Sequence, residues 1–66
     1  MSKTLEKIEK LPWVAHVDDE RGDGGSIIIT LKKGYFFTDD PGCGVMGVDN
    51  VQEAVMYTRK SSVYTK

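Results

Sequence analysis

Residues 39–60 read DDPGCGVMGVDNVQEAVMYTRK, and this stretch joins an irregular loop to a helix that carries its own boundary signals. One helix face is predicted by a stripe with spacing i, i+3, i+4 and i+7, formed by Val51, Ala54, Val55 and Thr58. Asp49 is the predicted N-cap, and Gln52 three residues later completes a pattern similar to a capping box. Arg59 and Lys60 complement the negative end of the helix dipole. The stretch therefore predicts a helix that begins just after Asp49.

Three strand patterns precede that loop. Trp13–Asp18 has apolar side chains at positions 13, 15 and 17, which predicts a half-buried strand with Trp13 as a core anchor. Ser26–Lys32 is rich in β-branched residues and places positions 27, 29 and 31 on one face. Lys33 and Gly34 then form a predicted two-residue turn into a third strand, Tyr35–Thr38. Together these patterns predict an antiparallel meander of three strands.

A short helix is predicted before the first strand. Ser2 or Thr4 provides an N-cap, and Pro12 ends the helix because it lacks an N–H group. One side of the helix is apolar through Leu5, Ile8 and Leu11. Residues 1–66 are thus predicted to form a single α+β domain with the order α-β-β-β-α, in which the C-terminal helix covers one face of the meander. Val63 and Tyr64 either add an edge strand or fray.

The composition limits the class of protein. A single cysteine excludes a disulfide framework and favours a reducing compartment. Uninterrupted apolar runs such as Ile27–Ile29 are far shorter than the ~20 residues that cross a bilayer. We therefore expect a soluble, cytoplasmic protein without membrane contact. No cofactor motif is present, and we expect none to be bound.

The charge is unevenly distributed, although the formal net charge is only −1. Residues 18–53 hold eight acidic and three basic side chains, whereas both ends are basic. The glycine-rich connection at 18–25 is expected to be a mobile hairpin tip. Acidic loops attract basic partners and accelerate their encounter. The predicted partner-binding residues are Asp18, Asp19, Glu20 and Asp23 on this tip, with Asp39 and Asp40 on the second loop.

The candidates for chemistry are few. Cys43 lies in a glycine-flanked loop, but a cysteine nucleophile needs an adjacent base and His16 is the only histidine. One Cys and one His are too few for a structural zinc site. The acids at 18–23 do not follow EF-hand spacing, because Arg21 and Thr30 stand where ligands should be. The glycines at 42, 44 and 47 lack the lysine of a phosphate-binding loop. We predict neither an enzyme nor a metal protein.

An alternative function is binding of single-stranded nucleic acid. Lys32 and Lys33 stand beside a run of aromatic residues, a combination that suits base stacking with cationic neighbours. Strand alternation, however, places Tyr35 and Phe37 on one face and leaves only Phe36 on the other. The alternative therefore uses Lys32, Lys33 and Phe36.

Several short motifs occur together in a fixed order: Asp23-Gly24-Gly25, Pro41-Gly42-Cys43, Gly47, Asp49 and Gln52-Glu53-Ala54. In this order they resemble the HicB antitoxin family, whose partial ferredoxin-like domain carries D-G-G, a strand, P-G-C, G-D-T and a helix that begins with E-E-A. The resemblance covers about half the chain. It departs from the family where Lys33-Gly34 interrupts the strand and where Met46 and Val48 lengthen the last spacing. The resemblance implies neutralisation of a small basic ribonuclease toxin.

These observations lead to one functional hypothesis. The absence of catalytic groups and the acidic loops favour a non-catalytic protein-binding inhibitor that occupies a basic surface of a nucleic-acid-handling partner. The size and charge pattern also resemble small phage-encoded inhibitors such as anti-CRISPR proteins. Self-association through the edge of Tyr35–Thr38 is a further prediction, since an uncovered strand edge invites pairing.

Overall fold

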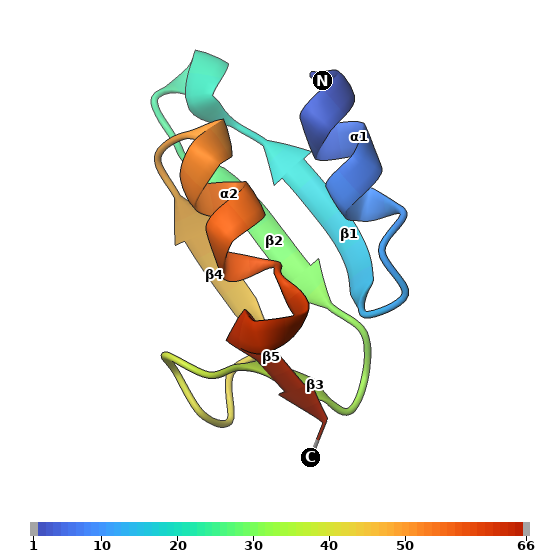
Figure 1. The fold of residues 1–66 in the computed structure, drawn as a ribbon. Coiled ribbons are helices and arrows are strands. Elements are labelled where there is room, and N and C mark those ends of the chain that lie inside the picture. Colours follow the sequence, from blue (N-terminus) through green and yellow to red (C-terminus); the bar gives the residue numbers. More distant parts are fainter. Residues whose placement is uncertain (1, 66) are drawn as a thin grey trace.

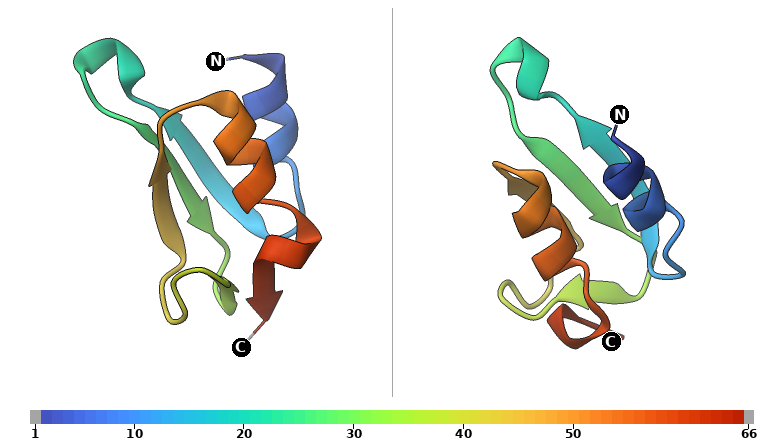
Figure 2. Two further views of the ribbon diagram at one scale, coloured as in Figure 1. Left: turned by 60° about the vertical axis from the view of Figure 1, so that its left-hand side comes forward. Right: turned by 45° about the horizontal axis from the view of Figure 1, so that its top comes forward.

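The computed structural model describes residues 2–65 as a small α+β fold in which both α-helices lie on the same face of an antiparallel sheet (Figures 1 and 2). The elements in chain order are α1 (Lys3–Glu9), β1 (Val14–Asp19), the 3₁₀ turn η1 (Arg21–Asp23), β2 (Ile27–Leu31), β3 (Tyr35–Phe37), β4 (Val45–Val48), α2 (Val51–Tyr57), the 3₁₀ turn η2 (Lys60–Ser62) and β5 (Val63–Thr65). The main sheet has the order β1-β2-β4, and β3 pairs with β5 in a separate two-stranded sheet. The predicted α+β class, with one helix before and one helix after the main sheet, is confirmed, and β5 follows the second helix.

Helix α1 begins where the sequence predicts. The Oγ atom of Ser2 accepts a hydrogen bond of 3.2 Å from the backbone N–H of Leu5, so Ser2 rather than Thr4 is the N-cap. Leu5 and Ile8 are both buried against the sheet. The helix gives way to a turn at Lys10, two residues before the proline.

Strand β2 is the centre of the main sheet. Its side chains Ile27, Ile29 and Leu31 are buried on the face that the helices cover, as the alternation predicts. Strand β1 pairs with it antiparallel, but the register shifts between Val14 and His16. Such a bulge inserts one extra residue and reverses the facing of the residues before it.

The bulge corrects the predicted facing of β1. Val14 and Val17 are buried, whereas Ala15 is exposed, so the apolar set is not at positions 13, 15 and 17. Trp13 stands just before the strand and is half-buried against the core rather than enclosed within it.

The third strand of the main sheet is β4, so the prediction that Tyr35–Thr38 fills this place is wrong. The predicted turn does form, with the N–H of Tyr35 bonded to the carbonyl of Lys32 at 3.0 Å. Only Gly34 has a positive φ, of 92°, as in a type II turn. Hairpins that continue a sheet favour turns whose twist matches the strands, and type II turns splay them. The chain therefore leaves the sheet after β2.

Strand β3 finds its partner much later in the chain. Phe36 pairs with Tyr64 and Phe37 with Val63. Val63 and Tyr64 therefore form a strand, which is one of the two alternatives predicted for them. Phe37 is completely buried. On its other side the N–H of Phe37 donates to the carbonyl of Cys43 at 3.2 Å, so that point of the edge already has a partner within the chain.

Helix α2 begins one residue later than predicted. Its N-cap is Asn50, whose Oδ1 accepts from the N–H of Glu53 at 2.8 Å. Asp49 lies one position earlier, and its own N–H donates to Glu53 Oε2 at 3.1 Å. Asn and Asp are equally good caps, and here the strand that ends at Val48 leaves Asp49 outside the helix. Of the predicted stripe, Ala54 is fully buried.

Candidate functional site

The connection that carries most of the predicted acidic residues is a structured turn. The N–H of Glu20 donates to the carbonyl of Ser26, and the carbonyl of Glu20 accepts from the N–H groups of Asp23 and Gly25, all at 3.0–3.1 Å. Gly24 ends η1 with a φ of 81°, which explains a glycine at this position. Instead of the mobile tip that its glycines suggest, residues 20–26 form one hydrogen-bonded unit that fixes the backbone at its two acidic residues, Glu20 and Asp23.

Asp19 is paired within this unit. Its carboxylate accepts bonds from Arg21 Nε and Nη2 at 3.0 and 2.9 Å, and from the Arg21 backbone N–H at 3.2 Å. These hydrogen bonds lower the pKa of Asp19 from 3.8 to about 2 and raise that of Arg21. The negative charge of Asp19 is therefore compensated inside the protein, which leaves Glu20 and Asp23 as the free acids of the turn.

Asp18 belongs to a different surface. Its Oδ2 lies 2.8 Å from Nε2 of His16, two residues earlier on the same face of β1. Glu9 of α1 lies on the other side of the imidazole, 3.8 Å from Nδ1, and its Oε2 accepts the N–H of Val17. Asp18 is thus part of a polar cluster on the side of the sheet that the helices leave uncovered.

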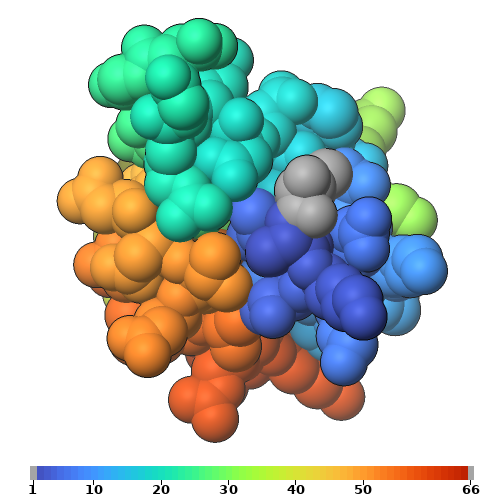
Figure 3. Space-filling model, turned by 90° about the horizontal axis from the view of Figure 1, so that it is seen from above, coloured from blue at the N-terminus to red at the C-terminus, as the bar shows by residue number. Residues whose placement is uncertain are grey.

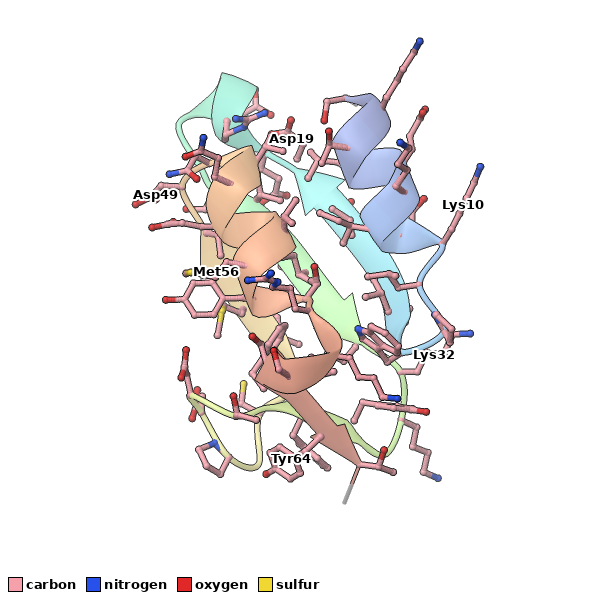
Figure 4. All side chains as sticks on the ribbon, viewed as in Figure 1. Lys10, Asp19, Lys32, Asp49, Met56 and Tyr64 are labelled. Atoms are coloured by element: carbon pink, nitrogen blue, oxygen red, sulfur yellow. The ribbon has the colours of Figure 1, made fainter. Side chains whose placement is uncertain are left out.

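The structure removes Asp18 from the predicted acidic tip and adds Asp49 to it. Ile27 pairs with Val48, so Asp49 lies beside residues 20–26 at the same end of the sheet (Figures 3 and 4). We call this surface the acidic end; it consists of Asp19, Glu20, Asp23 and Asp49.

Asp39 and Asp40 lie at the opposite end of the sheet. They follow β3 in the loop that leads to Val45, whose partner Thr30 is near the far end of β2 (Figure 1). The structure does not bring the two predicted acidic loops together. Sequence reasoning missed Asp49 as a surface acid because a helix cap already explained its presence, and only the strand pairing places it beside the tip.

A groove of about 460 Å³ runs between α1 and α2 on the side facing away from the sheet. Its lining is formed by Thr4, Lys7, Ile8, Leu11, Trp13, Val55, Thr58, Arg59 and Lys60. Trp13 is held in place, because its Nε1–H donates to the carbonyl of Thr58 at 2.8 Å. Val55 is 40% exposed although it belongs to the predicted core stripe. The stripe thus supplies a groove wall as well as core contacts.

The two-stranded sheet carries an aromatic pair. The rings of Phe36 and Tyr64 lie 5.7 Å apart between centroids, with an interplanar angle of 33°. The hydroxyl of Tyr64 accepts the N–H of Gly42, which ties the pair to the loop that carries Asp39 and Asp40. Phe36 is therefore not alone on its face, as alternation within β3 alone suggested.

Cys43 and His16 make separate contacts. The thiol of Cys43 donates to the carbonyl of Val45 at 3.1 Å, whereas His16 contacts Asp18 and Glu9. Within residues 2–65, no three His, Cys, Asp or Glu side chains come together as a metal-binding group.

Comparison with known proteins gives no match among family models, curated proteins or solved structures. The likeness to HicB antitoxins therefore depends on the motif residues alone. None of the helices in the described part of the chain is long and apolar enough to span a membrane.

Proposed function

We propose that this protein is a non-catalytic inhibitor that binds a basic surface of a nucleic-acid-handling protein through its acidic end. The observation that supports the proposal is the hydrogen-bonded turn at residues 20–26, which fixes the backbone of the exposed residues Glu20 and Asp23 at the end of the sheet that carries Asp49. A preorganised loop loses less conformational entropy when it docks than a flexible one. Three acids with no ion pair among the described residues are available to arginine and lysine side chains of a partner.

The proposal narrows the sequence-based hypothesis to one end of the molecule. Asp19 is already paired with Arg21, so it contributes little free charge, and Asp18 contacts His16 on a different surface. Asp39 and Asp40 cannot contact the same small partner surface as Glu20, because they lie beyond the other end of the sheet. An antitoxin-like or phage-encoded inhibitor of this kind would bind a cationic surface that otherwise holds nucleic acid.

The proposal is tested by comparing two charge-reversal variants, one at each end of the sheet. Glu20→Lys/Asp23→Lys alters the acidic end, and Asp39→Lys/Asp40→Lys makes the same change in charge at the opposite end. Immobilised wild-type protein and both variants are incubated with host lysate at low salt, and captured proteins are quantified by mass spectrometry. We expect a basic partner that is lost from the first variant, retained by the second and released by salt. The purified partner should then bind less nucleic acid when the wild-type protein is added.

The proposal is wrong if capture is equal for both variants, or if it is lost only from the variant at the opposite end. It is also wrong if the captured partner holds nucleic acid equally well with and without the wild-type protein. Circular dichroism of each variant controls for folding.

The second candidate is binding of single-stranded nucleic acid, which the Phe36–Tyr64 pair favours. Two neighbouring rings offer a base more aromatic surface than one exposed phenylalanine. The loop tied to Tyr64 carries Asp39 and Asp40, however, and these carboxylates repel phosphates. Anisotropy of labelled oligo(U) and oligo(dT) decides the matter. Binding that is lost in Phe36→Ala and Tyr64→Ala but kept in Glu20→Lys/Asp23→Lys would favour this function over the first.

A further inference from the structure

We propose that the groove between α1 and α2 is a second binding surface, which accepts an acidic amphipathic helix from a protein partner. It differs in place and in charge from the acidic end, and it does not depend on the function proposed above. The groove floor and walls are formed by Ile8, Leu11, Trp13 and Val55. Three cations, Lys7, Arg59 and Lys60, also line it.

The charge around the groove selects the occupant. No acidic side chain lines it, and none of the three cations forms an ion pair with any residue in the part of the chain that the structure describes. Apolar surface surrounded by unpaired cations suits a ligand with apolar anchors and carboxylates at its edges. A second copy of this chain docked through the same face would set Lys7, Arg59 and Lys60 against their equivalents, which is unfavourable.

The backbone chemistry of the groove selects a helix. The groove walls are formed by α1, α2 and the segments that follow each helix. In those segments the backbone carbonyls already accept hydrogen bonds from within the chain, at Leu11, Trp13, Thr58 and Arg59. An extended peptide would bury backbone groups with no partner here, and that is costly. A helix satisfies its own backbone and presents only side chains. Helices of this kind place anchors at i, i+3 or i+4 and i+7 in hydrophobic grooves.

The groove is also preorganised for an apolar anchor. Trp13 forms a wall whose orientation is fixed by its hydrogen bond to Thr58, and tryptophan is enriched at the energetic centres of protein interfaces. The hollow shape favours an inserted side chain over a flat membrane surface.

Trp13 is the only tryptophan of the chain and reports directly on the groove. The probe is a synthetic peptide of about 16 residues, long enough to be partly helical in water. It has Leu and Phe along one face, Glu along the others, and no Trp or Tyr. We expect saturable changes in Trp13 fluorescence with this peptide, confirmed by calorimetry. A peptide with Lys in place of every Glu, and a scrambled peptide of the acidic composition, should bind at least about tenfold more weakly.

Matched variants locate the binding. Val55→Glu places a charge in the groove wall, whereas Met56→Glu places the same charge one residue away on α2, outside the groove lining; the two side chains are 40% and 45% exposed. We expect Val55→Glu to lower the affinity for the acidic peptide about tenfold, and Met56→Glu to change that affinity less than about twofold. Arg59→Glu/Lys60→Glu should also lower the affinity for the acidic peptide about tenfold. Lys32→Glu/Lys33→Glu, which lies outside the groove, should leave that affinity unchanged.

Each other outcome overturns the proposal. Equal effects of Val55→Glu and Met56→Glu would place the peptide elsewhere. Equal binding of the acidic and lysine peptides would remove the charge argument. Binding to vesicles containing phosphatidylserine that requires Val55, without binding of the peptide, would identify a membrane surface. Concentration-dependent dimerisation abolished by Val55→Glu, again without peptide binding, would identify a second copy. The variants of the acidic end should bind the peptide normally, so failure here is distinct from failure of the proposed function.

Discussion

The indole Nε1–H of Trp13 donates a hydrogen bond of 2.8 Å to the carbonyl oxygen of Thr58, 45 residues later in the chain. This bond joins the segment after α1 to the C-terminal end of α2, where helix carbonyls lack partners within the helix. Both residues also line the groove between the two helices. This one contact thus gives a carbonyl at the end of α2 a hydrogen-bond donor and positions the indole that lines the groove.

Replacing the indole should measure this contact. We expect Trp13→Phe to lower the free energy of unfolding by about 1–2 kcal/mol, because the carbonyl of Thr58 loses its donor and part of the apolar contact is lost. Urea denaturation followed by circular dichroism gives the value. Tyr35→Phe is the control, since it removes a hydroxyl for which no hydrogen bond is seen among the described residues, and we expect a change within about 0.5 kcal/mol. Equal effects would contradict the assigned role of the bond.

Two neighbouring substitutions test the start of α2. Asn50→Ala removes the oxygen that accepts the N–H of Glu53, and we expect a loss of about 1 kcal/mol in stability. Asp49→Ala keeps that oxygen and the backbone N–H that donates to Glu53, so its cost should be about 0.5 kcal/mol or less. Thermal and urea denaturation of both variants give the comparison. A larger loss for Asp49→Ala would restore the cap that the sequence pattern favours.

Glycine substitutions test whether the turn at 20–26 is as well defined as its hydrogen bonds indicate. A Cβ atom at Gly25 would lie 3.1 Å from both the Cβ and the carbonyl oxygen of Glu20, so we expect Gly25→Ala to destabilise the protein by about 1 kcal/mol. Gly22 faces open space and its φ is not in the left-handed region. Gly22→Ala should therefore stabilise the protein by about 0.5 kcal/mol, by restricting the unfolded chain. A turn that tolerates both changes equally would be a flexible one.

The pairing of Asp19 with Arg21 predicts a specific pH dependence. The folded-state pKa of Asp19, about 2, lies below its ordinary value of 3.8, so the ionised form favours the folded state. This contribution is complete above the ordinary value and is lost as the pH falls through about 2. The carboxyl carbon of Asp19, followed by NMR, should titrate near that lower value in the wild-type protein. In Arg21→Gln the pKa of Asp19 should rise toward its ordinary value of 3.8, although the backbone N–H of residue 21 still donates to the carboxylate.

A wild-type midpoint near the ordinary value would show that the ion pair does not persist in solution. Arg21→Gln also adds an uncompensated negative charge to the acidic end, because Asp19 loses its cationic partner while the acids at 20 and 23 stay in place. The variant therefore shows how the charge of this surface alone affects binding.

Much of the fold was predictable because local patterns and tertiary contacts agree. The alternation in β2 and the cap at Ser2 are local signals, and the structure confirms them. Strand β4 has no comparable signal, since its four residues include Gly47 and only Val48 is buried. The aromatic run at 35–37 has a stronger strand propensity than β4, and it is therefore predicted to be the third strand of the main sheet. Which strand lies beside β2 is decided by the turn at Gly34 and by pairing across the chain.

The candidate surfaces were predictable only in part, for the same reason. Glu20 and Asp23 are only three residues apart in sequence and remain together in the fold. Asp49 joins them through the pairing of Val48 with Ile27, and no local pattern contains that information. The groove depends on Trp13 and Val55, which the periodicity assigned to the core. A helix stripe wider than the sheet can cover leaves its outer members free to line a surface groove.

The pairing of β3 with β5 has a consequence for the order in which the protein is made. Residues 27–31 can pair with residues 14–19 soon after both leave the ribosome, since a short turn separates them. Tyr35–Phe37 must wait until Val63–Thr65 has been synthesised, and until then Phe37, later fully enclosed, remains in water. During translation the nascent chain therefore carries an unpaired aromatic segment, which is a natural target for a chaperone.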